Sequence, residues 1–448
     1  MKDLLSDALT RSVDYLSGLA FRPVEPRPDA IAKLEAFSGP LPDAPTAPKE
    51  VLRRLDEWGS PATIANAGPR YFGFVTGGAL PASLAANWLA GAWDQNAHFV
   101  IGSPVAAALE NAALGWVREI LDLPKSWGGG FVTGTTMGNF SGLAAGRHAV
   151  LKKAGWDVEA QGLFRAPEVQ VIVGAEAHTT LLQALALVGF GRERVVKVPV
   201  DKQGRMLADR LPKLRSPCIV CLQAGNVNTG SFDPIAEIAA HARHAGAWIH
   251  LDGAFGLWAA ASPDTRHLTK GIADVDSIAT DLHKWLNVPY DNGLALYRDP
   301  EAARQALSIT AAYLPKGEER QPCDYTPESS RRARGVEIWA ALLSLGRSGL
   351  RELIERHCRF ARRFAGGLQG EGYEILNDVV LNQVLVSFGS DEQTARVITA
   401  VQEDGTCWCS GTTWRGRAAM RISVSSWATT EEDVERSLDA IVRVAKAI

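Results

Sequence analysis

The sequence lacks any run of about 18 consecutive apolar residues, the length that a membrane-spanning helix needs. Its N-terminal stretch also lacks the apolar core of a secretory signal, because charged and apolar residues alternate there at helical spacing. Neither charge sign dominates, since 47 lysines and arginines face 50 aspartates and glutamates for a net charge of −3. These absences argue against membrane insertion, export and nucleic-acid binding, and they predict a cytoplasmic protein that acts on small molecules.

Cysteine is scarce, with six residues in 448, which is too few for a disulfide framework. Two close pairs, Cys218 with Cys221 and Cys407 with Cys409, leave a zinc site open as an alternative. Both pairs lie in apolar, strand-like sequence without the turn glycines of a zinc knuckle. We therefore expect reduced cysteines that pack in the core, and no metal.

Short apolar runs alternate with helix-length segments from about residue 100 onward. This alternation is typical of an α/β fold in which helices cover both faces of a mostly parallel sheet. The expected strands are 131–133, 169–173, 195–199, 218–222, 248–252, 277–280 and 294–297. The expected helices between them include 105–121, 138–151, 179–187 and 234–245.

Three segments are predicted along the chain. Residues 1–60 read as a helical segment followed by a proline-rich stretch, residues 61–310 as the large domain, and residues 311–448 as a smaller α+β domain. Long amphipathic helices are expected in the last segment, at 336–345, at 350–368 and after Thr429. Thr429 and Glu432 have the spacing of a capping box for the final helix.

Asp252 and Lys284 follow neighbouring predicted strands. Asp252 ends the apolar run Trp-Ile-His-Leu-Asp, and Lys284 lies 32 residues later in Asp-Leu-His-Lys-Trp. Ligands collect at the carboxyl ends of the strands in an open α/β sheet. Singly, a strand-end aspartate is more often a turn residue and a lysine is more often solvated. Together they supply what pyridoxal 5'-phosphate (PLP) needs, an amine for its aldehyde and a carboxylate for its protonated ring nitrogen.

Two further elements follow predicted strands. Gly134-Thr135-Thr136 forms a turn at the start of a helix, whose free amides would bind a phosphate group. The alternative is a glycine-threonine turn without a ligand. His178 could stack on a planar cofactor or move a proton, and a structural histidine is the alternative.

With these residues the sequence resembles the group II PLP-dependent decarboxylases, which have the aspartate aminotransferase fold type (fold type I). The resemblance implies a mostly parallel seven-stranded sheet in the large domain and decarboxylation of an L-amino acid to an amine and CO2. The combination of the aspartate with His-Lys-Trp is highly specific. The similar segments are 96–110, 134–147, His178, 225–234, 250–254, 276–285, 330–332, Trp339 and 420–423.

The resemblance implies roles around the cofactor ring. Lys284 looks like the lysine that bonds to the aldehyde, and Asp252 looks like the partner of the ring nitrogen. Ala254 would lie beneath the ring, and His178 resembles the histidine stacked on its other face.

The phosphate group would be bound, by the same resemblance, by Gly134, Thr135 and Thr136 with help from Ser277 and His283. Asn226 stands in Gly-Asn-Val-Asn where the family usually has Gly-Thr-Thr, so its contact to the ring or phosphate would be altered. A second departure is Gln183, where the family usually has a lysine after the stacking histidine.

Four other residues are candidates for the substrate site by resemblance. Tyr313 resembles the loop tyrosine that reprotonates the substrate, with a surface or interface aromatic as the alternative. Arg421 resembles an arginine that meets the substrate carboxylate, and a salt-bridged strand arginine is the alternative. The family forms homodimers with active sites between subunits, where Phe72 and His98 would approach the partner's pocket, although packing would also explain them.

Other functions remain open on the same scaffold, namely another PLP-dependent lyase, an aldehyde synthase, an aminotransferase or an inactive PLP-binding homologue. Tyr313 favours decarboxylation among these. A nucleotide-binding Rossmann domain is disfavoured, because no predicted strand is followed by Gly-x-Gly-x-x-Gly with an acidic residue downstream.

Overall fold

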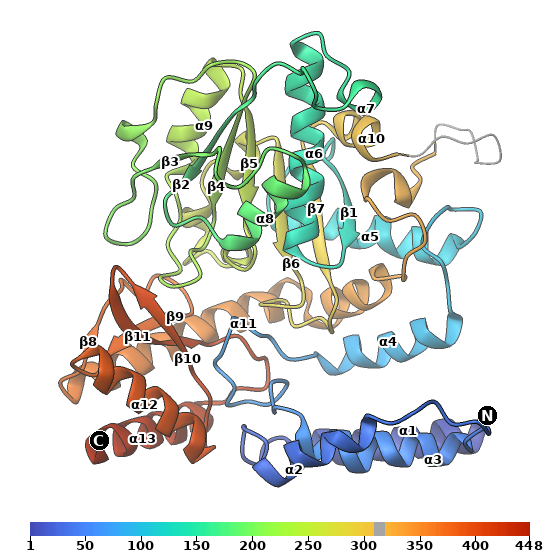
Figure 1. Ribbon diagram of the computed structural model, residues 1–448, viewed down its shortest axis with the longest axis vertical. Coiled ribbons are helices and arrows are strands. Elements are labelled where there is room, and N and C mark those ends of the chain that lie inside the picture. Colours follow the sequence, from blue (N-terminus) through green and yellow to red (C-terminus); the bar gives the residue numbers. More distant parts are fainter. Residues whose placement is uncertain (309–318) are drawn as a thin grey trace. The chain divides into compact units, whose positions relative to one another are not determined.

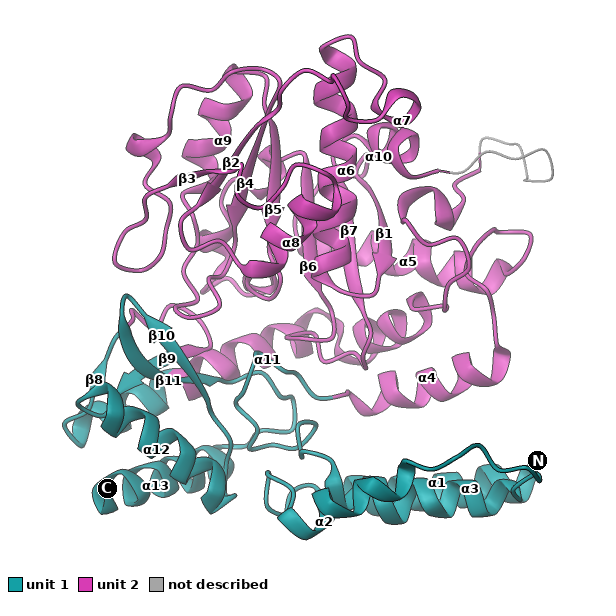
Figure 2. Cartoon of the chain, viewed as in Figure 1, with its two compact units in different colours: residues 1–78, 362–376, 384–448 teal, residues 79–361, 377–383 magenta. Residues whose placement is uncertain are grey.

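The computed structural model describes residues 1–308 and 319–448 (Figure 1). The described residues divide into two compact units, shown in Figure 2. Unit 1 comprises residues 1–78, 362–376 and 384–448, and unit 2 comprises residues 79–361 and 377–383. The three segments expected from the sequence stay a prediction.

Unit 2 is built on a sheet of seven strands within the described residues, in the order β1-β7-β6-β5-β4-β2-β3. β7 runs antiparallel to both of its neighbours, and the pairs from β6 through β3 are parallel. The strands are β1 (Gly128–Val132), β2 (Gln170–Gly174), β3 (Val196–Val198), β4 (Cys218–Gln223), β5 (Trp248–Asp252), β6 (Ser277–Asp281) and β7 (Gly293–Tyr297).

The central strands form because their residues are apolar toward both faces. Every residue of β5, β6 and β7 is buried, although successive side chains point to opposite sides of the sheet. Helices therefore cover both faces, and the predicted α/β fold with a mostly parallel seven-stranded sheet is confirmed. β1, β4, β5 and β6 point the same way, so the segments that follow them meet at one edge.

Helix α6 (Thr135–Lys153) lies directly on this sheet (Figure 1). Three glycines, spaced four residues apart, make the close approach possible. A Cβ on Gly138 would lie 3.0 Å from that of Ala279, and a Cβ on Gly146 would lie 2.6 Å from Cδ1 of Trp248. The other α-helices of unit 2 are α4 (Pro81–Trp93), α5 (Pro104–Ile120), α7 (Val158–Gln161), α8 (Thr179–Leu187), α9 (Ile235–His244) and α10 (Pro300–Leu307).

Helix α11 (Gly335–Gly370) begins in unit 2 and ends in unit 1. The two helices predicted at 336–345 and 350–368 are confirmed, because Gly346 interrupts α11 with a φ of 58°. Unit 1 also contains a four-stranded sheet within the described residues, in the order β10-β11-β9-β8. The elements of unit 1 are α1 (Lys2–Gly18), α2 (Pro28–Ala32), α3 (Pro48–Arg54), β8 (Glu374–Ile375), β9 (Gln383–Ser387), α12 (Asp391–Asp404), β10 (Ser410–Trp414), β11 (Arg417–Ser423) and α13 (Glu431–Ala447).

The cap predicted for the final helix was wrong by one residue. Thr430 and Asp433 form the capping box of α13. The Thr429 hydroxyl instead donates to the carbonyl oxygen of Pro69, at 2.7 Å. A long-range hydrogen bond therefore removes Thr429 from the cap.

All six cysteines are described, buried and free of disulfides. Burial raises the pKa of the Cys218 thiol to about 11, so this side chain is a neutral packing group at ordinary pH. Among the described residues, none of the helices combines the length and the apolar composition needed to cross a bilayer. The cytoplasmic location stays a prediction.

Candidate active site

A cavity of about 240 Å³ lies at the carboxyl edge of the large sheet. Most of the residues predicted to bind the cofactor line it. These are Gly134, Thr135, Thr136, His178, Asp252, Ala254, His283 and Lys284, joined by Thr180, Gln223, Gly225, Val227, Phe255 and Asp281. Segments that are up to 150 positions apart in sequence are therefore brought to one site.

Asp252 is the last residue of β5 and is buried. One carboxylate oxygen accepts a hydrogen bond from the Ala254 amide at 3.1 Å, and the other accepts from Nδ2 of Asn139 at 3.0 Å. Burial raises the pKa of Asp252, while the positive charges of His178 and Lys284 and the Asn139 hydrogen bond oppose that rise. The two hydrogen bonds and the neighbouring positive charges therefore favour the ionised carboxylate against the effect of its burial.

The Lys284 amine lies 3.0 Å from Oδ2 of Asp281, the last residue of β6. Oδ1 of Asp281 accepts a hydrogen bond from the Thr135 amide at 2.6 Å and lies 3.5 Å from Nε2 of His283. Burial alone would raise the pKa of Asp281, but Lys284, His283 and the Thr135 contact together hold it below its usual value. Asp281 therefore joins the lysine to the start of α6.

The start of α6 has the features of an anion site. Thr135 is the first residue of the helix, and its amide and that of Thr136 are among those without a partner inside the helix. The Thr135 hydroxyl is buried and makes no hydrogen bond within the described chain. Such an orphaned group is costly unless a ligand supplies its partner. These donors, with an amine and a carboxylate in the same cavity, fit the phosphate, aldehyde and ring nitrogen of PLP.

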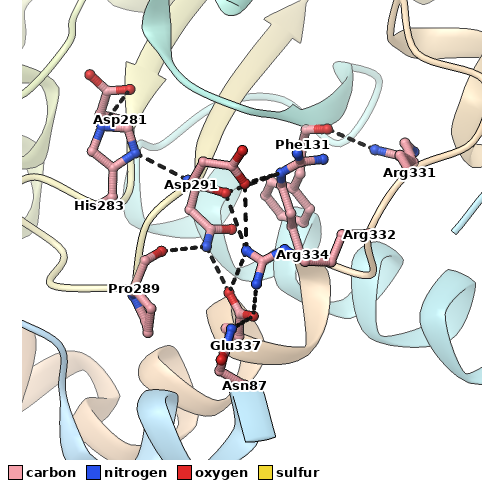
Figure 3. Close-up of polar contacts among 11 residues, drawn as sticks. Asn87, Phe131, Asp281, His283, Pro289, Asp291, Arg331, Arg332, Arg334 and Glu337 are labelled. Carbon is pink, nitrogen blue, oxygen red and sulfur yellow. Dashed lines mark hydrogen bonds and ion pairs between the residues drawn. The ribbon is translucent and has the colours of Figure 1, made fainter. Parts of the chain in front are cut away.

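His283 is held in one tautomer by the segment behind it (Figure 3). The Asn292 amide donates to Nδ1 of His283 at 3.1 Å, so the ring proton resides on Nε2. The Asn292 side chain donates to the buried carboxylate of Glu337 at 2.7 Å, and Glu337 pairs with Arg332 at 2.6 Å. This network fixes the loop that follows Lys284.

His178 caps the start of α8. Its Nδ1 accepts from the Thr180 amide at 3.3 Å and lies 2.7 Å from the Thr180 hydroxyl. The ring proton is therefore on Nε2 when the imidazole is neutral. His178 and Ala254 line the same cavity, as their predicted places beside the cofactor ring require.

Two residues predicted to bind the cofactor do not line the cavity. Ser277 begins β6, at the opposite end of the strand from Asp281, and its hydroxyl contacts His250 and Trp248. A phosphate contact by Ser277 is inconsistent with that position, because the residues predicted to bind the phosphate, Gly134, Thr135 and Thr136, line the cavity at the carboxyl edge. Oδ1 of Asn226 accepts from the amides of Asn228 and Thr229, so this side chain stabilises its own turn.

Of the residues predicted for the substrate, the three that the structure describes, Phe72, His98 and Arg421, are not part of this cavity's lining. Phe72 is fully buried in unit 1, where its ring packs edge-on against Phe364, and these contacts do not support a substrate contact within one chain. Nε2 of His98 lies 3.1 Å from the Ser329 hydroxyl, away from the lining residues. Arg421 lies in β11 of unit 1 and its role stays a prediction, and Tyr313 lies outside the described residues.

Sequence reasoning missed two residues of the site, Asp281 and Asn139. Asp281 stands three positions before Lys284 in a motif that was noted only for its histidine and lysine. Asn139 follows Thr135 by four positions, so one helix face carries both side chains toward the sheet. These two spacings are the features of the sequence from which both residues could have been predicted.

The chain was compared with known proteins. The family model described as the pyridoxal-dependent decarboxylase conserved domain matches residues 51–389. Tryptophan decarboxylase 1 of Oryza sativa subsp. japonica is 26% identical over 484 residues, which cover 98% of this chain and 93% of that protein. The 4-hydroxyphenylacetaldehyde synthase of Rhodiola rosea is also 26% identical, over 475 residues that cover 99% and 94%.

Solved structures show the same fold. The crystal structure of Oryza sativa TDC with PLP and tryptamine superposes with a TM-score of 0.92 at 23% identity, and the match covers 100% of this chain and 97% of that one. At this identity the likeness concerns the fold and leaves the substrate open.

Proposed function

The chain belongs to the pyridoxal-dependent decarboxylase family and is a carboxy-lyase that uses PLP, and from this premise we propose that it converts an L-amino acid to the corresponding amine and CO2. One observation carries the assignment of residues. The amine of Lys284, the carboxylate of Asp252 and the helix start at Thr135 line a single cavity.

Each residue has a proposed task in that cavity. Lys284 would bond through Nζ to the cofactor's aldehyde carbon with loss of water and would be displaced by the substrate's amine, and Asp281 would pair with the Lys284 ammonium while that side chain is free. Asp252 keeps the ring nitrogen protonated, and Thr135, Thr136 and His283 bind the phosphate. Bound PLP supplies an electron sink for the carbanion that remains when CO2 leaves the substrate's Cα.

His178 is the proposed proton donor to Cα within the described residues. The protonated imidazole would be the donor, because loss of the Nε2 proton from a neutral ring would leave an imidazolate; in the protonated ring Nδ1–H can donate to the Thr180 hydroxyl at 2.7 Å. The predicted contribution of Tyr313 to the same step is a separate proposal. Transfer of one proton to Cα balances the loss of CO2 and yields the amine.

Trapping of the cofactor tests the assignment of Lys284. Borohydride treatment of the holoenzyme should fix a pyridoxyl group on the peptide that contains Lys284, and Lys284→Ala should abolish the label and the activity. Lys270→Ala, which changes an exposed lysine of the same unit, is the matched control and should label as wild type does. Undiminished labelling of Lys284→Ala would remove Lys284 from this role.

The products decide between two candidate reactions. Relatives include 4-hydroxyphenylacetaldehyde synthase and phenylacetaldehyde synthase beside the decarboxylases. A decarboxylase releases the amine and CO2, whereas an aldehyde synthase consumes O2 and releases CO2, ammonia, hydrogen peroxide and an aldehyde in place of the amine. Aromatic L-amino acids are the first substrates to test, because the names of several relatives refer to them.

A homodimer is part of the proposal. Helix α1 exposes Leu5, Leu9, Val13 and Leu16 along one face, and a second subunit would cover this apolar stripe. Sedimentation of the purified protein would test the dimer. A monomer at micromolar concentration would contradict it.

A further inference from the structure

The hydrogen bonds of Asp252 continue behind the cavity into the core of unit 2. Asn139 donates to Asp252 at 3.0 Å, and its Oδ1 lies 2.9 Å from Nε2 of His250. Nδ1 of His250 lies 2.8 Å from the Ser277 hydroxyl, which accepts from the indole of Trp248 at 2.9 Å. All five residues are buried.

The donors and acceptors of these groups give the series of hydrogen bonds one direction, from Trp248 toward Asp252. A carboxylate only accepts, so Asn139 turns its NH2 toward Asp252 and its oxygen toward His250. Nε2 of His250 must then carry the ring proton, which leaves Nδ1 to accept from Ser277. Burial lowers the pKa of His250 to about 3, so the imidazole is neutral as this pattern requires.

The opposite direction would be less favourable. Asn139 would present its oxygen to the carboxylate of Asp252, and His250 would donate to Ser277. The Ser277 proton would then have only the Gly142 carbonyl oxygen, at 3.4 Å, the longest contact of the group. The indole of Trp248 donates to Ser277 in either case, so the direction of this last hydrogen bond is fixed.

The backbone of α6 lies close to the side chains of this hydrogen-bond network. A Cβ on Gly142 would lie 2.7 Å from Nδ1 of His250 and 3.1 Å from the Ser277 oxygen. Glycine at this position lets the helix lie against both side chains. Asn139, one turn earlier, then reaches His250 and Asp252 together.

We propose that Asn139, His250 and Ser277 are positioning residues that keep Asp252 ionised and aimed at the ring nitrogen of the bound cofactor. The inference rests on the proposed function, because it requires Asp252 to face that nitrogen. Hydrogen bonds aligned head to tail polarise one another, so each member strengthens the donor that reaches Asp252. None of the three needs to touch the cofactor.

The test compares two ligands on the same apoenzyme. PLP and 1-deazapyridoxal 5'-phosphate differ only in the ring nitrogen, which a C–H group replaces in the second. Asn139→Leu and His250→Leu should reduce the preference for PLP over this analogue by about tenfold, because a hydrogen bond to a charged group is lost. His250→Gln, which retains an amide donor for Asn139, should restore part of the preference.

Matched variants control for packing. Ser141→Ala removes a buried hydroxyl of α6 that donates to the Met137 carbonyl oxygen and also contacts the Tyr297 hydroxyl, outside the network of Asp252, and it should keep the wild-type preference. A merely structural defect would weaken both ligands by the same factor. If Asn139→Leu does not fold, Ser277→Ala removes only one hydroxyl from the same hydrogen-bond network, and its preference for PLP over the analogue is measured in the same way.

The outcomes separate this inference from the proposed function. Equal weakening of both ligands in the Asn139 and His250 variants, with the preference lost in Asp252→Asn, overturns the positioning role alone. An unchanged preference in Asp252→Asn shows instead that this carboxylate does not face the ring nitrogen, and the role given to Asp252 in the proposed function then fails together with the positioning role.

Discussion

The two ends of the cavity are built differently. At the end proposed to hold the cofactor ring (the ring end), the protein itself supplies hydrogen bonds to both carboxylate oxygens of Asp252 and, behind the cavity, to both imidazole nitrogens of His250. At the end proposed to hold the phosphate (the phosphate end), the Thr135 hydroxyl has no partner within the described chain, and the Thr135 amide is occupied by Asp281. The ring end is complete in the folded protein, whereas the phosphate end is left for a ligand to complete.

This difference has energetic consequences. Breaking a satisfied buried network leaves polar groups without partners and costs about 1–3 kcal/mol per group, so changes at the ring end should destabilise the apoenzyme. Removing an orphaned hydroxyl does not incur that cost. Changes at the phosphate end should therefore weaken cofactor binding and leave the stability of the apoenzyme intact.

At neutral pH the largest expected effect on stability is that of Gly142→Ala, which changes no polar atom of the ring end. The new Cβ would lie 2.7 Å from His250, and the resulting strain should lower the free energy of unfolding of the apoenzyme by about 1–3 kcal/mol. Denaturant unfolding measures this loss. Gly115→Ala in α5, where the nearest atom would be 3.9 Å away, should stabilise by up to about 1 kcal/mol. Equal stability of the two variants would show that α6 can move away from His250.

A pH dependence should come from His250. Its pKa is about 3 in the folded chain and 6.5 when unperturbed, so between these values the unfolded chain binds a proton that the folded chain does not. Stability from His250 is therefore complete above pH 6.5 and is lost as the pH falls, with a slope of about 1.4 kcal/mol per pH unit.

His250→Gln should remove this contribution. The difference between the wild-type and variant unfolding free energies, measured at a series of pH values, isolates it from the carboxylates that titrate in both proteins. His244→Gln, which replaces an exposed histidine of α9, is the control and should follow the wild-type curve. Parallel curves for wild type and His250→Gln would contradict a buried neutral imidazole.

The smallest effect on apoenzyme stability is expected at the phosphate end. Thr135→Val keeps the shape of the side chain and removes its orphaned hydroxyl, so PLP affinity should fall by about tenfold while apoenzyme stability is unchanged or slightly higher. Both PLP and its deaza analogue carry the phosphate, so both should weaken equally. A loss confined to PLP would place Thr135 at the ring end instead.

The sequence was sufficient for most of the sheet because its central strands are buried on both faces. Such strands appear in the sequence as continuous apolar runs. Among the helices, α8 was predicted with the bounds that the structure has. Most of the cavity lining followed from the rule that ligands lie at the carboxyl ends of parallel strands.

What the sequence could not show depends on contacts between distant residues. Asp281 is paired with an amide 146 positions away, and Thr429 with a carbonyl 360 positions away. Ser277 was assigned to the phosphate by resemblance, although it begins its strand and the phosphate donors follow the ends of theirs. Local spacing carries no information about which neighbour a side chain meets.

The glycines of α6 also bear on attempts to engineer a new substrate range. A library that enlarges residues 138, 142 or 146 would push the helix off the sheet and would be dominated by misfolded clones. Val227 lines the cavity from outside α6, so it can be diversified without displacing Asn139, whereas Thr180 should be kept because its hydroxyl and amide contact His178. A library designed in this way would keep the glycines of α6 unchanged and would vary only positions that line the cavity from outside the helix.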